Sequence, residues 1–147
     1  VDAIDDLGDG SVDVVAAFEV LEHLTEPTLD AFLAGARRVL KPGGKLLVTV
    51  PIMYGLTLPV KEVSRMVLHR RLGDTGVLEM AKATLGMPIA RAPNPLSSHK
   101  GFDFRWLESR IAALFTIHEQ ARSPFPSLPW WLNSQAIFIA GQRSGAI

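Results

Sequence analysis

Apolar residues form two short continuous runs with a helical pattern between them. Residues 12–18 (VDVVAAF) and 45–50 (KLLVTV) are rich in β-branched and aliphatic side chains, which is typical of strands buried on both faces of a parallel sheet. Over residues 25–40, apolar side chains recur every three or four positions, which predicts an amphipathic helix. These apolar positions are Leu29, Phe32, Leu33, Ala36, Val39 and Leu40. Strand, helix and strand make a βαβ unit, so we expect the two strands to be parallel neighbours.

The last third of the chain contains one further helix and two further strands. Asp103 precedes apolar residues at helical spacing and predicts the N-cap of a helix that runs to residue 114. Residues 115–121 and 135–141 are strand candidates. A connection rich in proline and tryptophan separates them, at residues 123–133. We expect these two strands to follow the helix directly.

Residues 53–98 interrupt this alternation and are interpreted as a helical insertion. Val60, Val63 and Val67 mark one face of a first helix, and a second helix is expected at about residues 75–85. A loop with several prolines closes the insertion at residues 88–98. We therefore expect one domain over residues 1–147, with the insertion as a substrate lid.

Composition narrows the classes of function without choosing one. The chain has 147 residues, is 48% hydrophobic and 20% charged, and its formal net charge is +0, so nothing global points to a nucleic acid partner. It has no cysteine, which excludes disulfides, thiol catalysis and thiolate metal sites and is compatible with the cytoplasm. The longest apolar stretch, residues 46–60, contains Pro51 and Pro59 and is too short for a transmembrane helix.

Four segments together resemble the middle and later motifs of class I S-adenosylmethionine-dependent methyltransferases in their order and spacing. They are Asp2-Ala3, SVDVV at 11–15, FEVLEHL at 18–24 and RVLKPGGKLLVTVP at 38–51. The resemblance implies a three-layer, Rossmann-like α/β fold with a mostly parallel sheet that ends in an antiparallel hairpin. Residues 12–18 and 45–50 would be the fourth and fifth of seven strands, in the spatial order four, five, seven, six. The resemblance is close over residues 1–52, loose over 99–143 and absent from the insertion.

The same resemblance implies where S-adenosylmethionine would bind. The position of Asp2 accepts a hydrogen bond from the adenine amino group in this family, and a carboxylate is suited to accept it. The backbone at Ala3 would contact the adenine ring. Phe18, Glu19 and Val20 leave the carboxyl end of a strand, where open α/β sheets bind their ligands.

The glycine-rich turn that receives the methionine part of the cofactor has no match. Gly8-Asp9-Gly10 follows no strand and precedes a strand instead of a helix. We therefore expect an N-terminally truncated methyltransferase that is inactive alone, whose full-length parent methylates an oxygen of a small-molecule or glycosidic acceptor. Two alternatives stay open: a non-catalytic interaction module, and a substrate-binding subunit completed by another chain.

Glu19, Glu22 and His23 have the spacing i, i+3 and i+4, which would place them on one face of a helix. Carboxylates with an imidazole suit Mg²⁺ or Mn²⁺. This segment resembles small-RNA 2′-O-methyltransferases and ubiquinone-pathway O-methyltransferases, which hold a divalent ion against substrate hydroxyls. The segment SHKGFDFRW at 98–106 resembles the one that supplies a further histidine in the small-RNA enzymes, which implies His99 as the fourth ligand.

A metal-free interpretation stays open for the same residues. Many methyltransferases without a metal carry an E-x-x-E-H run in which the histidine orients a loop and the glutamates are solvated. His23 or His99 would then be the catalytic general base, because an imidazole titrates near working pH. The partner would in either case be a small molecule.

The aromatic residues between the last two strands allow three interpretations. Phe125, Trp130 and Trp131 could cover the active site, form a hydrophobic plug or make a peripheral membrane contact. Arg65, with the two arginines at 70 and 71, forms a basic cluster that is either a solvated face or a contact for an anionic group. Oligomeric state and the acceptor have no signature in the sequence.

Overall fold

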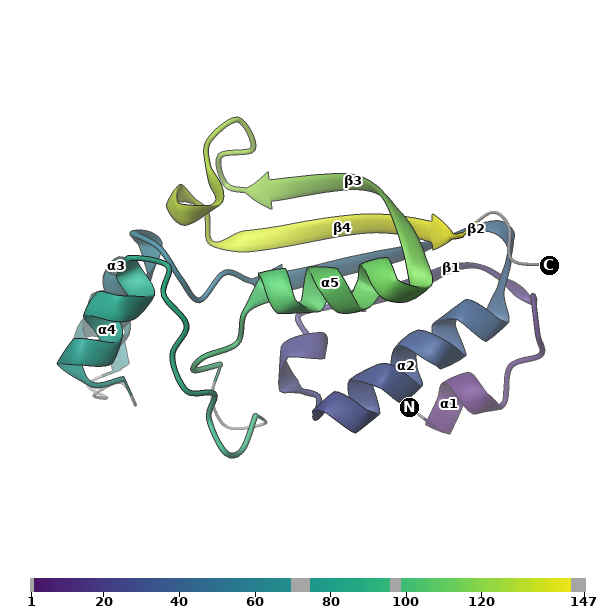
Figure 1. Ribbon diagram of the computed structural model, residues 1–147, viewed down its shortest axis with the longest axis horizontal. Coiled ribbons are helices and arrows are strands. Elements are labelled where there is room, and N and C mark those ends of the chain that lie inside the picture. Colours follow the sequence, from purple (N-terminus) through teal and green to yellow (C-terminus); the bar gives the residue numbers. More distant parts are fainter. Residues whose placement is uncertain (1, 70–74, 96–98, 144–147) are drawn as a thin grey trace.

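The computed structural model describes residues 2–69, 75–95 and 99–143, and its centre is a four-stranded sheet (Figure 1). The strands are β1 (Val12–Phe18), β2 (Leu40–Pro51), β3 (Phe115–Ser123) and β4 (Gln135–Gln142), in the order β1-β2-β4-β3. β1 and β2 are parallel, whereas β4 is antiparallel to both β2 and β3. This order confirms the expected four, five, seven, six arrangement. Because only the β1 and β2 pairing is parallel, the described sheet is mixed rather than mostly parallel.

The βαβ unit is formed by β1, helix α2 (Glu26–Val39) and β2. The expected helix face is directed inward, and Leu29, Leu33, Ala36 and Val39 are all at most 1% exposed. Thr25 occupies the N-cap, but its hydroxyl contacts the Thr28 hydroxyl instead of capping a backbone amide. The helix therefore owes its position to burial of its apolar face on the sheet.

Helix α5 (Phe104–Leu114) lies beside α2 under the same face of the sheet (Figure 1). Its N-cap is Asp103, as expected, and the carboxylate accepts a hydrogen bond from the Arg105 backbone amide at 2.9 Å. Leu107 and Ile111 are fully buried. The N-cap and the apolar spacing, both local features of the sequence, thus define this helix. β3 follows it directly in the sequence and returns the chain to the sheet.

Among the described residues, helices cover one face of the sheet only. Figure 1 shows α1 (Asp2–Asp5), α2 and α5 together below the strands. On the opposite face Val14 and Phe18 are 51% and 58% exposed, so β1 is not buried on both faces as expected. The third layer of the expected three-layer fold has no element within residues 2–69, 75–95 and 99–143.

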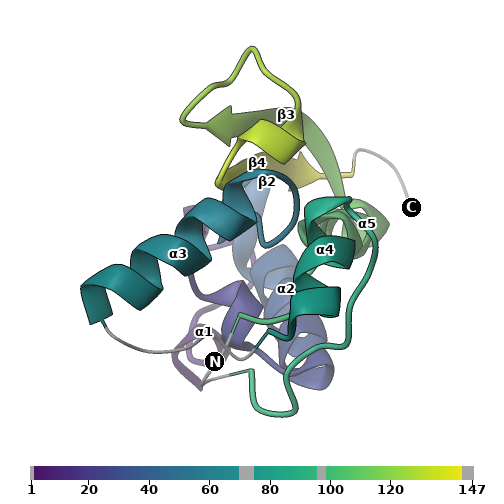
Figure 2. The ribbon, with the colours of Figure 1, turned by 90° about the vertical axis from the view of Figure 1, so that its left-hand side faces the viewer.

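The insertion forms two helices at one end of the sheet, α3 (Thr57–His69) and α4 (Val77–Thr84) (Figures 1 and 2). They pack around a small core of their own, made of Tyr54, Leu58 and Ala83. In the part of the chain that the structure describes, no helix has the length and hydropathy to cross a bilayer. The side chain of Arg65 and the arginines at 70 and 71 lie outside the described residues.

The cap of α5 offers a direct test of this local analysis. Asp103→Ala removes the capping carboxylate and its ion pair with Arg105, so it should lower the free energy of unfolding by about 1 kcal/mol. Ser109→Ala, at an exposed position of the same helix, should change stability by less than about 0.5 kcal/mol. Urea denaturation followed by circular dichroism measures both values. Equal effects of the two substitutions would contradict the assigned cap.

Candidate functional site

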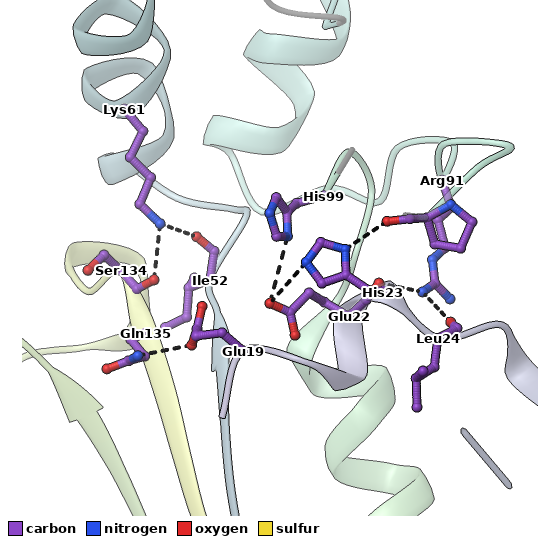
Figure 3. A network of polar contacts seen from close by, with 11 residues as sticks. Glu19, Glu22, His23, Leu24, Ile52, Lys61, Arg91, His99, Ser134 and Gln135 are labelled. Carbon is purple, nitrogen blue, oxygen red and sulfur yellow. Dashed lines mark hydrogen bonds and ion pairs between the residues drawn. The ribbon is translucent and has the colours of Figure 1, made fainter. Parts of the chain in front are cut away.

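The chain reverses direction immediately after β1. Glu19 has φ 53, and its amide donates a hydrogen bond to the Thr49 carbonyl of β2 at 2.9 Å. A short 3₁₀ turn follows at Leu21–His23. Because Glu19 is in the left-handed region, it does not share a helical face with Glu22 and His23, and the expected i, i+3, i+4 arrangement is wrong for it. Its carboxylate instead accepts a hydrogen bond from Gln135 of β4 at 2.9 Å (Figure 3).

Three of the four expected metal ligands do converge. The side chains of Glu22, His23 and His99 offer atoms that all lie within 4.8 Å of one another. Glu22 Oε1 is 4.0 Å from His23 Nε2 and 3.8 Å from His99 Nδ1, and the two imidazole rings are 4.6 Å apart (Figure 3). The fold thus brings the 3₁₀ turn and the segment before α5 to one point.

Glu22 is the most unusual group of this cluster. Its side chain is buried, and neither carboxylate oxygen has a hydrogen-bond partner among the described residues. Burial raises the pKa of Glu22, and the negative charge of Glu19 adds to that effect. A buried carboxylate with no donor is stable only if it is protonated or faces a cation.

The protonation of His23 is set by the insertion. Its Nδ1 lies 3.0 Å from the backbone carbonyl of Pro95, and a carbonyl can only accept, so Nδ1 carries a proton. In the neutral imidazole the lone pair is then on Nε2, the atom that faces Glu22. This geometry is the usual one for a histidine that binds a metal or accepts a proton.

Arg91 fixes the insertion against the 3₁₀ turn. One of its guanidinium nitrogens donates to the backbone carbonyls of Glu22 and Leu24, at 2.9 and 3.0 Å. The guanidinium also lies 5.7 Å from the ring centres of both Phe102 and Trp106. No local spacing marks Arg91 in the sequence, because its partners are about seventy residues away along the chain.

A second polar group forms around Glu19 and Gln135. Lys61 of α3 donates to the carbonyls of Ile52 and Ser134, at 3.1 and 3.0 Å (Figure 3). Burial lowers the pKa of Lys61, while the charge of Glu19 acts in the opposite direction. Sequence analysis missed this group, because its members come from different elements and share no motif.

The expected cofactor residues divide into two sets. Phe18 and Val20 are 58% and 47% exposed at the carboxyl end of β1, so an apolar surface is available there. Asp2 and Ala3 belong to α1, and their side chains lie outside the described residues.

Comparison with known proteins finds similarity over the first third of the chain. A family model described as a methyltransferase domain matches residues 1–48, which contain β1, the 3₁₀ turn, α2 and most of β2. An uncharacterized 37.1 kDa protein in transposon TN4556 of Streptomyces fradiae is 46% identical over 61 residues, which are 40% of this chain and 17% of that protein. Residues 1–48 of this chain are thus similar to a methyltransferase domain.

Solved structures are similar to this chain in fold. The PH0226 protein of Pyrococcus horikoshii OT3 matches with a TM-score of 0.59 and 17% identity, over 94% of this chain and 57% of its own. An S-adenosylmethionine-dependent methyltransferase of Methanosarcina mazei matches with a TM-score of 0.48 and 17% identity, over 92% of this chain and 61% of its own. The matches thus cover 57% of the Pyrococcus protein and 17% of the Streptomyces one.

The burial of Glu22 predicts a pH-dependent stability. A carboxyl whose pKa is raised on folding stabilises the fold fully below its ordinary value of 4.5, and this contribution is lost as the pH rises through the raised value. Without metal, Glu22→Gln should therefore raise the free energy of unfolding at pH 7 by about 1 to 3 kcal/mol. The difference should vanish below pH 4.5. Thermal unfolding at several pH values, in the presence of a chelator, measures it.

The exposed Glu119 on β3 provides the matched control. Glu119→Gln should leave the free energy of unfolding nearly unchanged, both at pH 7 and below pH 4.5. A solvated carboxylate contributes little to stability, so its removal has little effect. A loss of stability in Glu22→Gln at pH 7 would show that the carboxylate is compensated in the folded chain.

Proposed function

We propose that this chain forms the acceptor side of a domain that transfers a methyl group from S-adenosylmethionine to an oxygen of a small-molecule or glycosidic acceptor. The observation that carries the proposal is the cluster of Glu22, His23 and His99 beside the carboxyl end of β1. Ligands of open α/β sheets bind at that edge. In methyl transfer the protein positions donor and nucleophile and removes the acceptor proton, and this cluster supplies groups for the proton.

The cofactor would lie against the corner that follows β1. S-adenosylmethionine supplies the methyl group when it is bound. The exposed apolar surfaces of Phe18 and Val20 would suit its adenine ring, and Glu19 lies between them in the sequence. By the family resemblance, Asp2 would accept a hydrogen bond from the adenine amino group and the backbone of Ala3 would contact the ring.

A divalent ion fits the cluster chemically. Glu22 offers a buried carboxylate without a hydrogen-bond partner among the described residues, and His23 directs Nε2 towards it. Glu22, His23 and His99 would hold Mg²⁺ or Mn²⁺, of which Mn²⁺ accepts imidazole more readily. Such an ion lowers the pKa of a bound hydroxyl and so eases loss of the acceptor proton. Glu19 could join as a fourth ligand only by leaving Gln135.

Without an ion, the same geometry supports a simple base. Nε2 of His23 carries a lone pair and faces the interior of the cluster, so it would take the acceptor proton directly. Glu22 would then stabilise the imidazolium that forms. His99 could accept a proton in the same way, from the opposite side of Glu22.

Titration with Mn²⁺ distinguishes the two possibilities. If the ion is held by the cluster, the chain should bind one Mn²⁺ by electron paramagnetic resonance, and His99→Ala should weaken binding by about tenfold or more. His118→Ala, at an exposed position of β3, should leave binding unchanged. Absence of Mn²⁺ binding, or equal loss in both variants, would reject the metal and leave His23 as the base.

The exposed face of the sheet supports a second candidate function, that of a substrate-binding subunit or interaction module derived from a methyltransferase. Val14 and Phe18 present apolar surface on the side of the sheet that the described helices do not cover. Such a surface suits a further packed layer, supplied by the same polypeptide or by another chain. Methyl transfer by a full-length parent alone would favour the enzyme over this alternative.

The 147-residue chain alone should bind S-adenosylmethionine with a dissociation constant above about 1 mM. The corner around Glu19 and the position of Asp2 offer about one charge-assisted hydrogen bond, worth roughly 1.5 to 3 kcal/mol. Association costs roughly 4 to 15 kcal/mol, which that contact cannot offset. Isothermal titration calorimetry is the test, and a low micromolar dissociation constant would show that other residues form the cofactor site.

A further inference from the structure

A cavity of about 310 Å³ lies between the insertion and the connection from β3 to β4. It is lined by Leu56, Thr84, Leu85, Trp130 and Trp131. None of these residues belongs to the Glu22 cluster or to the polar group around Glu19. The cavity is therefore a separate feature of the molecule, with its own chemistry.

The chemistry of the lining is almost entirely apolar. Thr84 carries the one side-chain hydroxyl, which already donates to the carbonyl of Met80 at 2.8 Å within α4. The remaining lining side chains are two leucines and two tryptophans. The volume is near the lower end of the range for small-molecule sites, roughly 300 to 1,000 Å³. A slender hydrocarbon group suits such a site better than a polar one.

The walls of the cavity are fixed by close packing. Gly55 has φ 88, and a Cβ there would lie 2.6 Å from the Trp131 backbone, so the turn after β2 closes tightly on the tryptophan. The Leu56 amide also donates to the Trp131 carbonyl at 2.8 Å. Trp130 packs on Phe104 with ring centres 5.8 Å apart, and the Arg105 guanidinium lies 5.1 Å from its ring. The part of the wall that the Leu56 backbone, Trp130 and Trp131 form is thus held in place by contacts within the chain.

The mouth of the cavity is accessible and apolar. Leu56, Leu85 and Trp131 are 50%, 75% and 39% exposed. Scattered apolar side chains on a surface are ordinary, whereas adjacent ones around a concave site mark a place for a ligand. A hydrocarbon chain can therefore enter from solvent.

A short stretch of backbone joins the cavity to the candidate site. Trp131 lines the cavity, and Gln135, four residues later, binds the Glu19 carboxylate. Four residues span at most about 14 Å, since an extended chain advances roughly 3.3 to 3.6 Å per residue. The backbone of Trp131 at the cavity therefore lies within about 14 Å of the backbone of Gln135, the residue that binds Glu19.

We propose that this cavity binds the aliphatic tail of the methyl acceptor, so that the acceptor is an amphiphile whose hydroxyl head faces the Glu22 cluster. The assignment of the tail to an acceptor rests on the proposed function. The affinity of the cavity for a hydrocarbon chain is independent of the proposed function.

Unbranched fatty acids, kept below their micellar concentration, are the probe for the cavity. Tryptophan fluorescence of the 147-residue chain should report saturable, one-to-one binding of dodecanoic acid, because two of the three tryptophans line the site. Hexanoic acid should bind at least about tenfold more weakly, since each buried methylene contributes about 0.8 kcal/mol. Non-saturable binding, or equal binding of the two acids, would overturn the proposal.

Two exposed leucines near the ends of α4 give matched variants. Leu85→Asp places a carboxylate at the cavity and should weaken dodecanoic acid binding by about tenfold or more. Leu78→Asp is a control of the same chemistry, because Leu78 is 70% exposed but does not line the cavity. It should change binding by less than about twofold. Equal losses would indicate adsorption to exposed apolar surface and overturn the proposal.

The two proposals fail separately. Absence of methyl transfer by a longer protein that contains this sequence, with fatty acid binding intact, would reject the proposed function but leave the cavity as a lipid-chain site. Stronger partition of the chain onto phosphatidylcholine vesicles, reduced equally by Leu85→Asp and Leu78→Asp, would identify a membrane surface as the occupant and overturn the cavity proposal.

Discussion

The reversal of the chain at Glu19 determines where every polar group of the candidate site lies. A non-glycine residue in the left-handed region costs roughly 1 to 3 kcal/mol, so the surroundings must hold it there. They do so from two strands: the Thr49 carbonyl of β2 accepts the Glu19 amide, and Gln135 of β4 binds the carboxylate. The turn then directs Leu21 into the core and leaves Glu22 buried beside it. One backbone conformation therefore separates Glu19 from Glu22 and sends their carboxylates to different partners.

The insertion completes the site that this turn begins. Arg91 and Pro95 bind the turn from the insertion, and His99 follows directly after it, so the carboxylate is enclosed and two imidazoles face it. Burial of the acid, the tautomer of His23 and the position of His99 thus all depend on the same segment. Its sequence can be expected to constrain the chemistry as strongly as the motif around Glu22.

Local patterns were sufficient for most elements of the fold. β1 has the expected bounds, α2 and α5 have the expected buried faces, and Asp103 caps α5 because a cap depends on neighbouring residues alone. The pattern could not show that Val14 and Phe18 remain exposed, since an apolar strand looks the same whether its second face is covered or open. Helical spacing also failed at Glu19, because the left-handed turn carries no signal when the residue is not glycine. His99 was found only through resemblance, and Arg91 and Lys61 were missed, because their partners are distant in sequence.

Asn133 holds two parts of the proposed acceptor site in fixed positions relative to each other. These are the apolar cavity and the polar group around Glu19. Its side chain is fully buried, accepts a hydrogen bond from the Phe125 amide and donates to three carbonyls of the connection between β3 and β4. Those carbonyls belong to Phe125, Leu128 and Pro129. A buried amide with all these bonds satisfied rigidifies the loop, whereas its loss would leave several backbone groups unpaired. Because Asn133 lies between the tryptophans that line the cavity and Gln135, which binds Glu19, the same network sets the cavity wall and the partner of Glu19 together.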